Sequence, residues 1–180
     1  MNNIKIVEKS NSVSWEEITE VIHDAYAERE QQNLHFAAFK STPEENAQKI
    51  IDGKCFVALD GTKVVGVVFL RCPSWPYLTN KNGKEKRYCD KNYGTVLNLS
   101  VKEKYKSRGI GRKLLEKLIE ECNKQKLDSI MIDTSSSLKR LNKFYDSYGF
   151  KKIDYISWPT TNYYTAVSYT HLRAHETLSD

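Results

Sequence analysis

A basic, glycine-containing loop between a predicted strand and a predicted helix is the feature of the sequence with the clearest chemistry. The strand covers residues 95–101, the loop reads Lys-Tyr-Lys-Ser-Arg-Gly-Ile-Gly-Arg over residues 104–112, and the helix begins near Gly109. A turn from a strand into a helix points several free backbone N–H groups at one place, and the helix dipole adds positive potential there. Gly109 and Gly111 let the backbone approach an oxygen-rich ligand without interference from a Cβ atom. The loop therefore predicts a pyrophosphate site.

Two better-known phosphate loops do not fit these residues. A Walker A loop ends in Gly-Lys-Ser/Thr, whereas Arg112 and Lys113 follow Gly111 here. A dinucleotide-binding fingerprint requires a third glycine where Leu114 stands. Taken alone, the Gly-Ile-Gly segment fits a plain tight turn as well as it fits a phosphate site.

The elements that must position this loop follow from the pattern of apolar residues and from the caps. Ser14 and Thr42 are predicted N-caps, the second followed by Pro43 at the first helical position. Strands are predicted at residues 4–7, 54–59, 63–70, 95–101, 129–133, 151–155 and from 163 onward, and helices at residues 15–26, 43–53, 109–124 and 138–149. Residues 27–40 are predicted to be irregular, and residues 72–93 form a polar insert, either a long loop or a small hairpin. The order of elements indicates a mixed α/β sheet with helices packed on its faces.

The segment Phe144-Tyr145-Asp-Ser-Tyr-Gly149-Phe150 ends the last predicted helix. Together with the strand, the basic loop and its helix, and strand 129–133, it resembles the acetyl-CoA core of the GNAT superfamily of N-acetyltransferases, in the same order and spacing. The family loop, Gln/Arg-x-x-Gly-x-Gly/Ala, falls on residues 106–111, where Lys106 replaces Gln/Arg but keeps a charge. The resemblance covers roughly residues 4–165 and is most specific over residues 94–155.

The resemblance implies the GNAT fold, a mixed, mostly antiparallel sheet of six to seven strands with helices on both faces. It also implies that strand 95–101 carries a bulge and splays from strand 129–133, so that the pantetheine arm of acetyl-CoA lies in the gap. Main-chain groups of Leu99 and Val101 would bond the pantetheine amides, and N–H groups of residues 107–112 would bind the pyrophosphate. The cofactor-binding residues implied in this way are Leu99, Ser100, Val101, Lys106, Ser107, Arg108, Gly109, Ile110, Gly111 and Arg112.

Tyr145 is the catalytic residue that the resemblance implies, because the family tyrosine at this position lies near the CoA sulfur and protonates the departing thiolate. A half-buried packing tyrosine is the alternative reading. Many relatives hold CoA with an Asn seven residues earlier, where this chain has Leu138, so that contact is lost or passes to Ser137 or Asn142. The sequence does not identify the group that accepts the proton of the attacking amine, because strand 95–101 contains Asn98 but no acidic residue. The candidates are Glu28, Glu30, Asp90 and an ordered water chain.

The predicted function is transfer of the acetyl group of acetyl-CoA to a primary amine of a small molecule or a peptide, by direct attack in a ternary complex. A CoA-binding module without catalysis is the main alternative. A nucleic-acid-binding protein is disfavoured, because much of the net charge of +5 gathers at the predicted cofactor loop and no nucleic-acid-binding motif is present. The acceptor is expected to meet aromatic residues and one histidine from the first two helices, the insert and the closing strands: Tyr26, His35, Phe36, Trp75, Tyr77, Tyr93, Trp158 and Tyr163.

Composition sets further limits on partners and compartment. No apolar run approaches the roughly 20 residues of a membrane helix, and no export signal is visible, so a cytoplasmic protein that does not bind membranes is expected. The four cysteines do not have metal-ligand spacing, and no metal is predicted. Cys72 and Cys89 could form a disulfide, although reduced thiols are expected in this compartment. The expected assembly is a monomer or a homodimer.

Residues 167–180 look foreign to the rest of the chain. Their sequence, Val-Ser-Tyr-Thr-His-Leu-Arg-Ala-His-Glu-Thr-Leu-Ser-Asp, matches one reading frame of a transposase-type sequencing adapter that begins CTGTCTCTTATACACATCT. The prediction is a GNAT N-acetyltransferase domain over residues 1–166 followed by an adapter-derived tail. Deleting that tail is expected to leave stability unchanged, although residues 167–169 could complete the last strand.

Overall fold

The computed structural model describes residues 4–71, 78–79, 85–86, 92–158 and 161–172. Cys72, Trp75, Tyr77, Cys89 and Asp90, all named above, lie outside the described residues. The helices are α1 (Trp15–Gln31), α2 (Pro43–Gln48), α3 (Ile110–Lys124) and α4 (Lys139–Asp146), with 3-10 turns at Ala37–Lys40 and Glu103–Tyr105. The strands are β1 (Lys5–Glu8), β2 (Gly53–Asp60), β3 (Lys63–Arg71), β4 (Leu78–Thr79), β5 (Glu85–Lys86), β6 (Tyr93–Val101), β7 (Ser129–Ser135), β8 (Lys151–Ser157) and β9 (Tyr164–His171).

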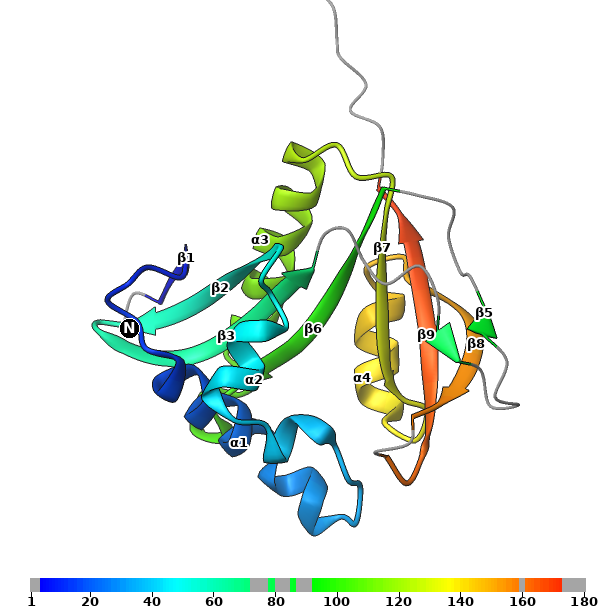
Figure 1. Ribbon diagram of the computed structural model, residues 1–180, viewed down its shortest axis with the longest axis horizontal. Coiled ribbons are helices and arrows are strands. Elements are labelled where there is room, and N and C mark those ends of the chain that lie inside the picture. The colour runs from blue at the N-terminus through cyan, green and yellow to red at the C-terminus, as the bar shows by residue number, and fades with distance from the viewer. Residues whose placement is uncertain (1–3, 72–77, 80–84, 87–91, 159–160, 173–180) are drawn as a thin grey trace, which may run out of the picture.

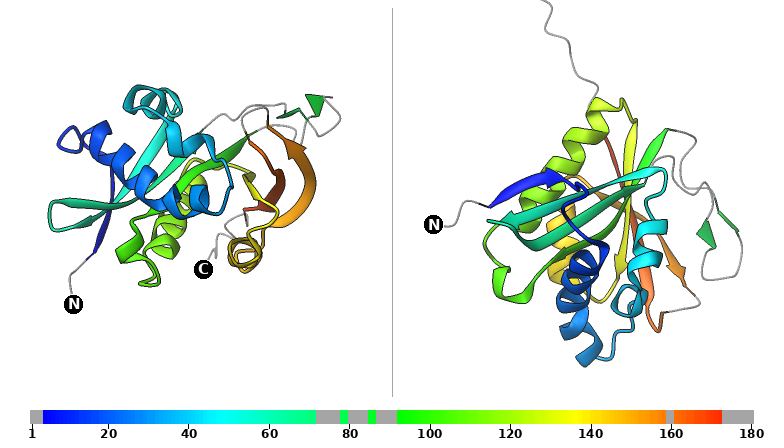
Figure 2. Two further views of the ribbon diagram at one scale, coloured as in Figure 1. Left: turned by 90° about the horizontal axis from the view of Figure 1, so that it is seen from below. Right: turned by 60° about the vertical axis from the view of Figure 1, so that its left-hand side comes forward.

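Seven strands form the main sheet in the order β1-β2-β3-β6-β7-β9-β8, while β4 and β5 pair separately (Figure 1). Every neighbouring pair is antiparallel except β6 and β7, which run parallel. Helices α1 and α2 cover one face of the sheet, and α3 and α4 cover the other (Figure 2, left). The predicted mixed, mostly antiparallel sheet with helices on both faces is therefore confirmed.

The parallel pair β6–β7 opens along its length, and this opening creates the gap that the resemblance implies. The two strands pair from Tyr93 with Ser129 to Val96 with Ile132 and no further, although both continue. On its other edge, β6 changes register against β3 between Leu97 and Ser100, because two residues of β6, Asn98 and Leu99, lie opposite one of β3. Asn98 has a positive φ of 49°, the left-handed conformation that a bulge of this kind favours. The bulge turns the end of β6 away from β7.

Three helix ends differ from those predicted. Helix α4 ends at Asp146 rather than near Gly149, because the residues after it form i→i+3 turns. Helix α1 continues to Gln31, through residues that were expected to be irregular, because Ala27, Glu28, Arg29 and Glu30 are good helix formers. Helix α2 ends at Gln48 rather than at Gly53. The residues after it form i→i+3 turns, and Ile51 is 73% exposed, so there is no core for another helical turn to cover. Both predicted N-caps, Ser14 and Thr42, are present, and the structure shows a capping box at each.

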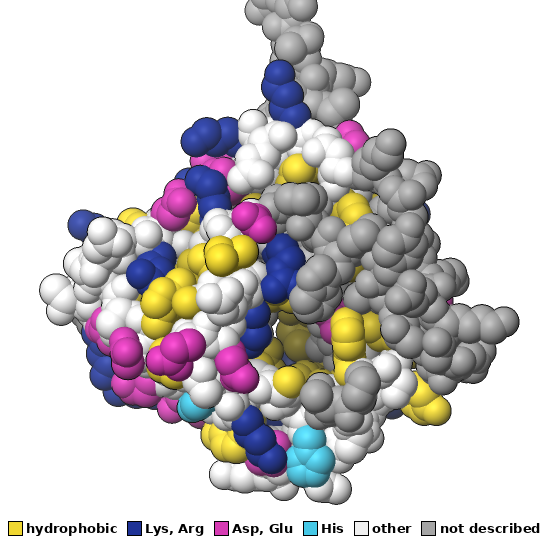
Figure 3. Space-filling model, viewed as in Figure 1, with side chains coloured by type: hydrophobic (Ala, Val, Ile, Leu, Met, Phe, Trp, Pro, Cys, Tyr) yellow, Lys and Arg dark blue, Asp and Glu magenta, His cyan; other side chains and the backbone are white. Residues whose placement is uncertain are grey.

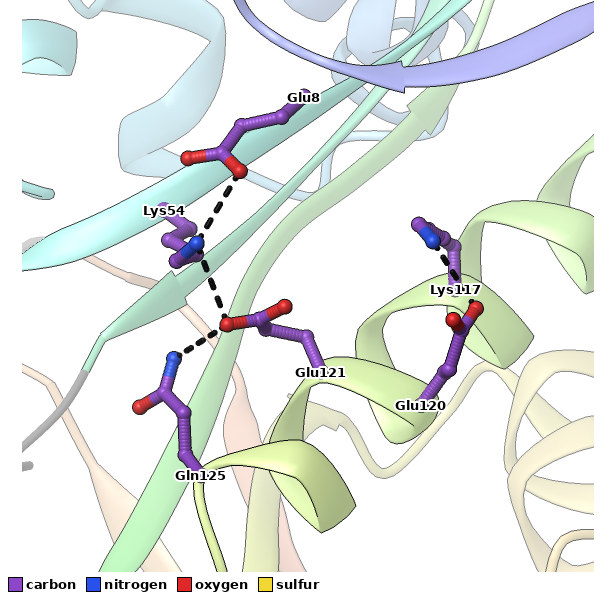
Figure 4. Close-up of polar contacts among 6 residues, drawn as sticks. All are labelled: Glu8, Lys54, Lys117, Glu120, Glu121 and Gln125. Atoms are coloured by element: carbon purple, nitrogen blue, oxygen red, sulfur yellow. Dashed lines mark hydrogen bonds and ion pairs between the residues drawn. The ribbon is translucent and has the colours of Figure 1, made fainter.

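Helix α3 packs closely on the sheet because Gly66 of β3 leaves room for it. A Cβ atom at Gly66 would lie 3.0 Å from Leu114 and 3.2 Å from Ile110, which is closer than nearly all real Cβ contacts. At the other end of α3, Lys54 Nζ lies 3.1 Å from a Glu8 carboxylate oxygen and 3.2 Å from Glu121 Oε1 (Figure 4). These contacts fix the direction of α3, and therefore the place where its N-terminus meets the end of β6.

Burial raises the pKa of Glu121, but the hydrogen bonds that Gln125 and Lys54 donate to its carboxylate outweigh that effect (Figure 4). The pKa of Glu121 therefore lies below its ordinary value. A carboxyl group with a lowered pKa contributes stability at neutral pH that is lost as the pH falls through that value. The network thus holds α3 on the sheet most firmly in its ionised state.

Strand β9 runs through the predicted boundary at residue 166. It lies between β7 and β8, pairs with β7 as far as His171 and with β8 as far as Tyr169, and buries Val167 completely. Beyond the strand, the Leu172 N–H donates to the Asp128 carbonyl oxygen at 3.0 Å. The origin of residues 167–180 stays a prediction, but residues 167–171 form part of the sheet.

Truncation should therefore have different effects at two places. Ending the chain after Leu172 should leave the melting temperature unchanged. Ending it after Ala166 should lower stability strongly, because burying Val167 alone contributes about 1.5–3 kcal/mol and the strand pairing of residues 167–171 would also be lost. Thermal unfolding of the two shortened chains beside the full chain measures the difference. Equal melting temperatures for all three would show that this part of β9 does not stabilise the fold.

No helix in the described part of the chain combines the length and the apolar character needed to cross a membrane. Among the same residues, no group of three or more His, Cys, Asp or Glu side chains is placed to hold a metal ion. Cys55 and Cys122 are both buried.

Candidate active site

The loop between β6 and α3 presents a row of free backbone N–H groups. Among the described residues, no partner is found for the amide N–H groups of residues 107–112, and the first helical bond runs from the Lys113 N–H to the Gly109 carbonyl oxygen at 3.1 Å. Ser107 and Gly109 have positive φ values of 62° and 76°, which turn the loop tightly into the helix. A Cβ atom at Gly109 would have nothing within 4 Å, so the space in front of this backbone is open. This arrangement suits a phosphate anion.

Helix α1 and the turn between β2 and β3 hold this loop in place. The Glu103 N–H donates to Asp24 Oδ2 at 2.7 Å, and Lys102 Nζ contacts Glu20 at 2.5 Å. The Tyr105 hydroxyl donates to Asp60 at 2.9 Å. The loop is therefore fixed before any ligand binds, which limits the entropy lost on binding.

The cations of the loop differ in what they contact. Lys106 Nζ contacts Glu103 and lies 3.5 Å from Glu28. By contrast, the Arg108 guanidinium lies over the Tyr105 ring and that of Arg112 over the Tyr148 ring, at 5.0 and 5.8 Å from the ring centres. Neither arginine has an ion-pair partner in the described part of the chain. Arg108 and Arg112 therefore supply the uncompensated positive charge next to the free N–H groups.

The edge of β6 that faces β7 is open from Leu97 to Val101. Leu99, Ser100 and Val101 lie on this stretch, with Ser100 only 2% exposed. Their other edge pairs with β3, so backbone groups that point into the gap have no strand partner. An extended amide chain could pair there as a strand would.

Two groups able to transfer protons meet at this gap, Tyr145 from α4 and Asp133 from β7. Tyr145 is 5% exposed and packs edge-on against Phe150. Burial raises the pKa of the Tyr145 hydroxyl well above its usual value, and the neighbouring Tyr26 and Asp133 raise it further. Asp133 lies one residue beyond the last β6–β7 pair, on the sheet face opposite α3, and its side chain keeps some contact with solvent. Because Asp133 lies deep in the protein, desolvation raises the pKa of its carboxyl group.

Aromatic residues surround the Asp133 carboxylate. The Trp158 indole N–H donates to Asp133 Oδ2 at 3.1 Å. Rings of Tyr26, Phe36 and Tyr163 follow one another at centroid distances of 5.0 and 4.7 Å. Burial, followed by the nearby Asp133 carboxylate, raises the pKa of Tyr26 to about 12, and burial also raises the pKa of Tyr163.

A hollow opens on this face of the molecule, between the α1–α2 side and the β7–β9 side (Figure 3). Hydrophobic side chains form part of its wall, and Lys and Arg side chains lie along one edge.

The other residues that the sequence suggested for the site lie elsewhere or have other partners. Glu28 lies beside Lys106 at the loop, and Glu30 accepts a hydrogen bond from His35 Nδ1 at 3.0 Å, so neither is grouped with Tyr145. Asn142 uses its amide to donate to the Ser135 and Leu138 carbonyl oxygens. Tyr93 is a core residue, packed with Met131, Ile156 and Val167.

Asp133 is the acid that the sequence reasoning missed. It ends an apolar run, Ser129 to Asp133, which reads simply as a buried strand. The available signal was its place at the carboxyl end of a strand predicted beside strand 95–101 in a mixed sheet, since ligand sites gather at the carboxyl ends of parallel strands.

The arrangement combines an anion-binding helix N-terminus, an open strand edge, a protonated tyrosine and a partly desolvated carboxylate around one gap. Such a set can hold a diphosphate with an extended arm, protonate a leaving group and accept a proton from a nucleophile.

Comparison with known proteins supports one family. The model of the Acetyltransferase (GNAT) family matches residues 15–150. No curated protein matches the chain. Among solved structures, the ribosomal-protein-S18-alanine N-acetyltransferase from Escherichia coli is similar with a TM-score of 0.72 at 16% identity, covering 99% of this chain and 100% of that one. The PaiA N-acetyltransferase from Thermoplasma acidophilum in complex with coenzyme A has a TM-score of 0.69 at 15% identity, covering 94% and 99%.

An acetyltransferase of the GNAT family from Staphylococcus aureus Mu50 has a TM-score of 0.67 at 21% identity, covering 95% of this chain and 100% of that one. At these identities the structural matches show a shared fold. The family model, by contrast, matches well over half of the sequence and spans the loop, the gap and Tyr145. The chain belongs to the acetyltransferase (GNAT) family.

Proposed function

We propose that the protein is an acetyl-CoA-dependent N-acetyltransferase that acts on a primary amine by direct attack in a ternary complex. The observation that carries this proposal is the loop of free N–H groups beside the gap where β6 leaves β7, with Tyr145 and Asp133 near that gap. The family supports the acyl transfer, and a relative of the same fold is known as a complex with coenzyme A. The named substrate of the Escherichia coli relative, an alanine of a ribosomal protein, is consistent with an amine acceptor.

The proposed cofactor contacts follow the geometry from the loop to the gap. The N–H groups of residues 107–112 and the side chains of Arg108 and Arg112 would bind the pyrophosphate. Lys106 would have to leave Glu28 and Glu103 to take part. The open edge at Leu99, Ser100 and Val101 would pair with the pantetheine arm and bring the thioester to Tyr145 and Asp133.

The two titratable groups would then divide the proton transfers. Asp133 accepts a proton from the acceptor ammonium, so that the neutral amine attacks the thioester carbonyl carbon. A C–N bond forms and the C–S bond breaks. Tyr145, which its raised pKa keeps protonated at neutral pH, donates its proton to the departing thiolate. The attacking nitrogen loses a second proton as the amide forms, and this proton restores the tyrosinate to tyrosine. The products are the acetylated amine and CoA, and Asp133 releases the proton that it accepted to solvent before the next turnover.

The experiment for this proposal compares the protein with Tyr145→Phe. The substitution keeps the ring that packs against Phe150 and removes only the hydroxyl, so turnover should fall about 100-fold while acetyl-CoA affinity changes little. Thiol release with an amine panel measures turnover, and calorimetric titration measures affinity.

Equal turnover in the variant would make Tyr145 a packing residue. Acetyl-CoA binding without thiol release for any amine would instead favour a CoA-binding module without catalysis. Tyr148→Phe serves as the matched control, since Tyr148 also packs against Phe144 but its hydroxyl donates to Glu116, outside the gap.

A further inference from the structure

The Asp133 carboxylate is a negative charge that nothing in the described part of the chain neutralises. Its one side-chain hydrogen bond comes from the neutral Trp158 indole, and it has no ion-pair partner among those residues. A carboxylate held deep in a protein without a cation attracts positive charge and repels negative charge strongly.

The aromatic residues around Asp133 favour the same kind of ligand. Tyr26 and Phe36 come from the α1–α2 side, and Tyr163 and Trp158 come from the segment between β8 and β9. The face of a tyrosine or tryptophan ring carries partial negative charge and attracts ammonium groups. This aromatic wall and the Asp133 carboxylate near it therefore select for a cation.

A pair of hydrogen bonds holds this wall together before a ligand enters. The Asn162 side chain accepts from the His35 N–H at 2.9 Å and donates to the Asn33 carbonyl oxygen at 2.8 Å. These bonds join the two segments that carry Phe36 and Tyr163, whose rings are in contact. A wall fixed in this way gives a ligand little freedom to move its charges away from Asp133.

Arg29 of α1 is the basic residue whose charge acts on Tyr26, and its guanidinium lies 4.0 Å from a Glu28 carboxylate oxygen, whereas Arg71 and Lys49 lie on the β3 side of the sheet. Arg71 ends β3, opposite Thr95 of β6, which in turn lies opposite Met131 of β7. Arg71 is therefore two strands away from β7. Lys49 lies beside Arg71, because the Lys49 carbonyl oxygen accepts a hydrogen bond from Arg71 Nε at 2.8 Å. The Lys49 ammonium donates a hydrogen bond to Asn46.

We propose that the acceptor is a primary amine with no carboxylate on the carbon next to the amine, so that simple amines and amidated or peptide N-termini are substrates and free α-amino acids are not. This inference rests on the proposed function. A carboxylate one carbon from the amine would lie about 5 Å from Asp133, and at that distance the repulsion corresponds to at least about a 100-fold loss in kcat/KM.

Three acceptors of the same ring size isolate this charge: phenethylamine, phenylalaninamide and phenylalanine. The first two should be acetylated with kcat/KM values at least about 100-fold above that of phenylalanine. Phenylalanine acetylated within about threefold of phenylalaninamide would overturn the proposal, because the two have nearly the same size and shape and only phenylalanine carries the carboxylate.

A binding experiment keeps this test separate from the chemistry. The same three compounds are titrated calorimetrically into the complex of the full chain with CoA, for the original protein and for Asp133→Asn. The original protein should prefer the two cations, and the variant should lose most of that preference. The proposed function fails if no amine releases thiol, and the inference fails if binding does not depend on the carboxylate or if none of the three binds at about 10 mM.

Discussion

Replacing Asp133 by Asn is expected to lower kcat/KM for an amine acceptor by about 100-fold or more and, at the same time, to raise the melting temperature. The loss of activity follows because the amide cannot accept the proton of the attacking ammonium. The Trp158 indole can still donate to the amide oxygen, so the surroundings of the side chain are retained.

The gain in stability follows from the sign of the pKa shift. Desolvation raises the pKa of Asp133 above its ordinary value of 3.8, so the folded protein binds this proton more tightly than the unfolded chain does. Stability due to this group is therefore present at low pH, is lost as the pH rises through the raised pKa, and stays lost at neutral pH. Asparagine has no charge to desolvate, so the variant should be more stable at pH 7 and similar to the original at pH 3.5.

Steady-state kinetics and thermal unfolding at the two pH values measure both effects. Asp146→Asn is the matched control, because it makes the same chemical change at an exposed position of α4 and should alter neither quantity. An Asp133→Asn variant with full activity would show that the amine loses its proton elsewhere. A variant with lower stability at pH 7 would show that the ionised Asp133 carboxylate does not destabilise the folded protein.

The second large effect is expected at Gly109, where Gly109→Asp should lower acetyl-CoA affinity by about 100-fold. The residue has a φ of 76° and nothing within 4 Å of its Cβ position, so an aspartate fits the unliganded fold. Asp tolerates this left-handed conformation better than most residues and is a favourable N-cap. Its carboxylate would occupy the place where the N–H groups of α3 are expected to meet the pyrophosphate.

Gly109→Asn separates charge from shape, because Asn has nearly the same size and the same tolerance for a positive φ. Acetyl-CoA should raise the melting temperature of the original protein clearly and that of the Asn variant somewhat less. It should leave that of the Asp variant nearly unchanged, since the shift depends on the ratio of ligand concentration to Kd. Thermal unfolding with and without millimolar acetyl-CoA provides the comparison. Equal shifts for the two variants would place the pyrophosphate away from this helix N-terminus.

The sequence by itself determined the parts of this protein that depend on neighbours along the chain. The N-caps at Ser14 and Thr42, the dense apolar strand at residues 63–70 and the glycine loop before α3 are local signals, and all appear in the structure where they were expected. The order of these elements also sufficed to indicate the family and its sheet, because the loop and the Tyr145 segment carry a family pattern.

The tertiary structure alone decided where the acid of the candidate site lies and how β9 ends. Asp133 reads as the last residue of a buried strand, and it becomes distinctive only because β6 leaves β7 one residue earlier and because Tyr26, Trp158 and Tyr163 converge on it from elsewhere in the chain. Residues 167–171 lack a pattern that marks them as a strand, yet β7 and β8 on either side supply backbone partners to any chain that fits between them. Desolvation and strand pairing both depend on atoms that are distant in sequence and close in space, and no local pattern records them.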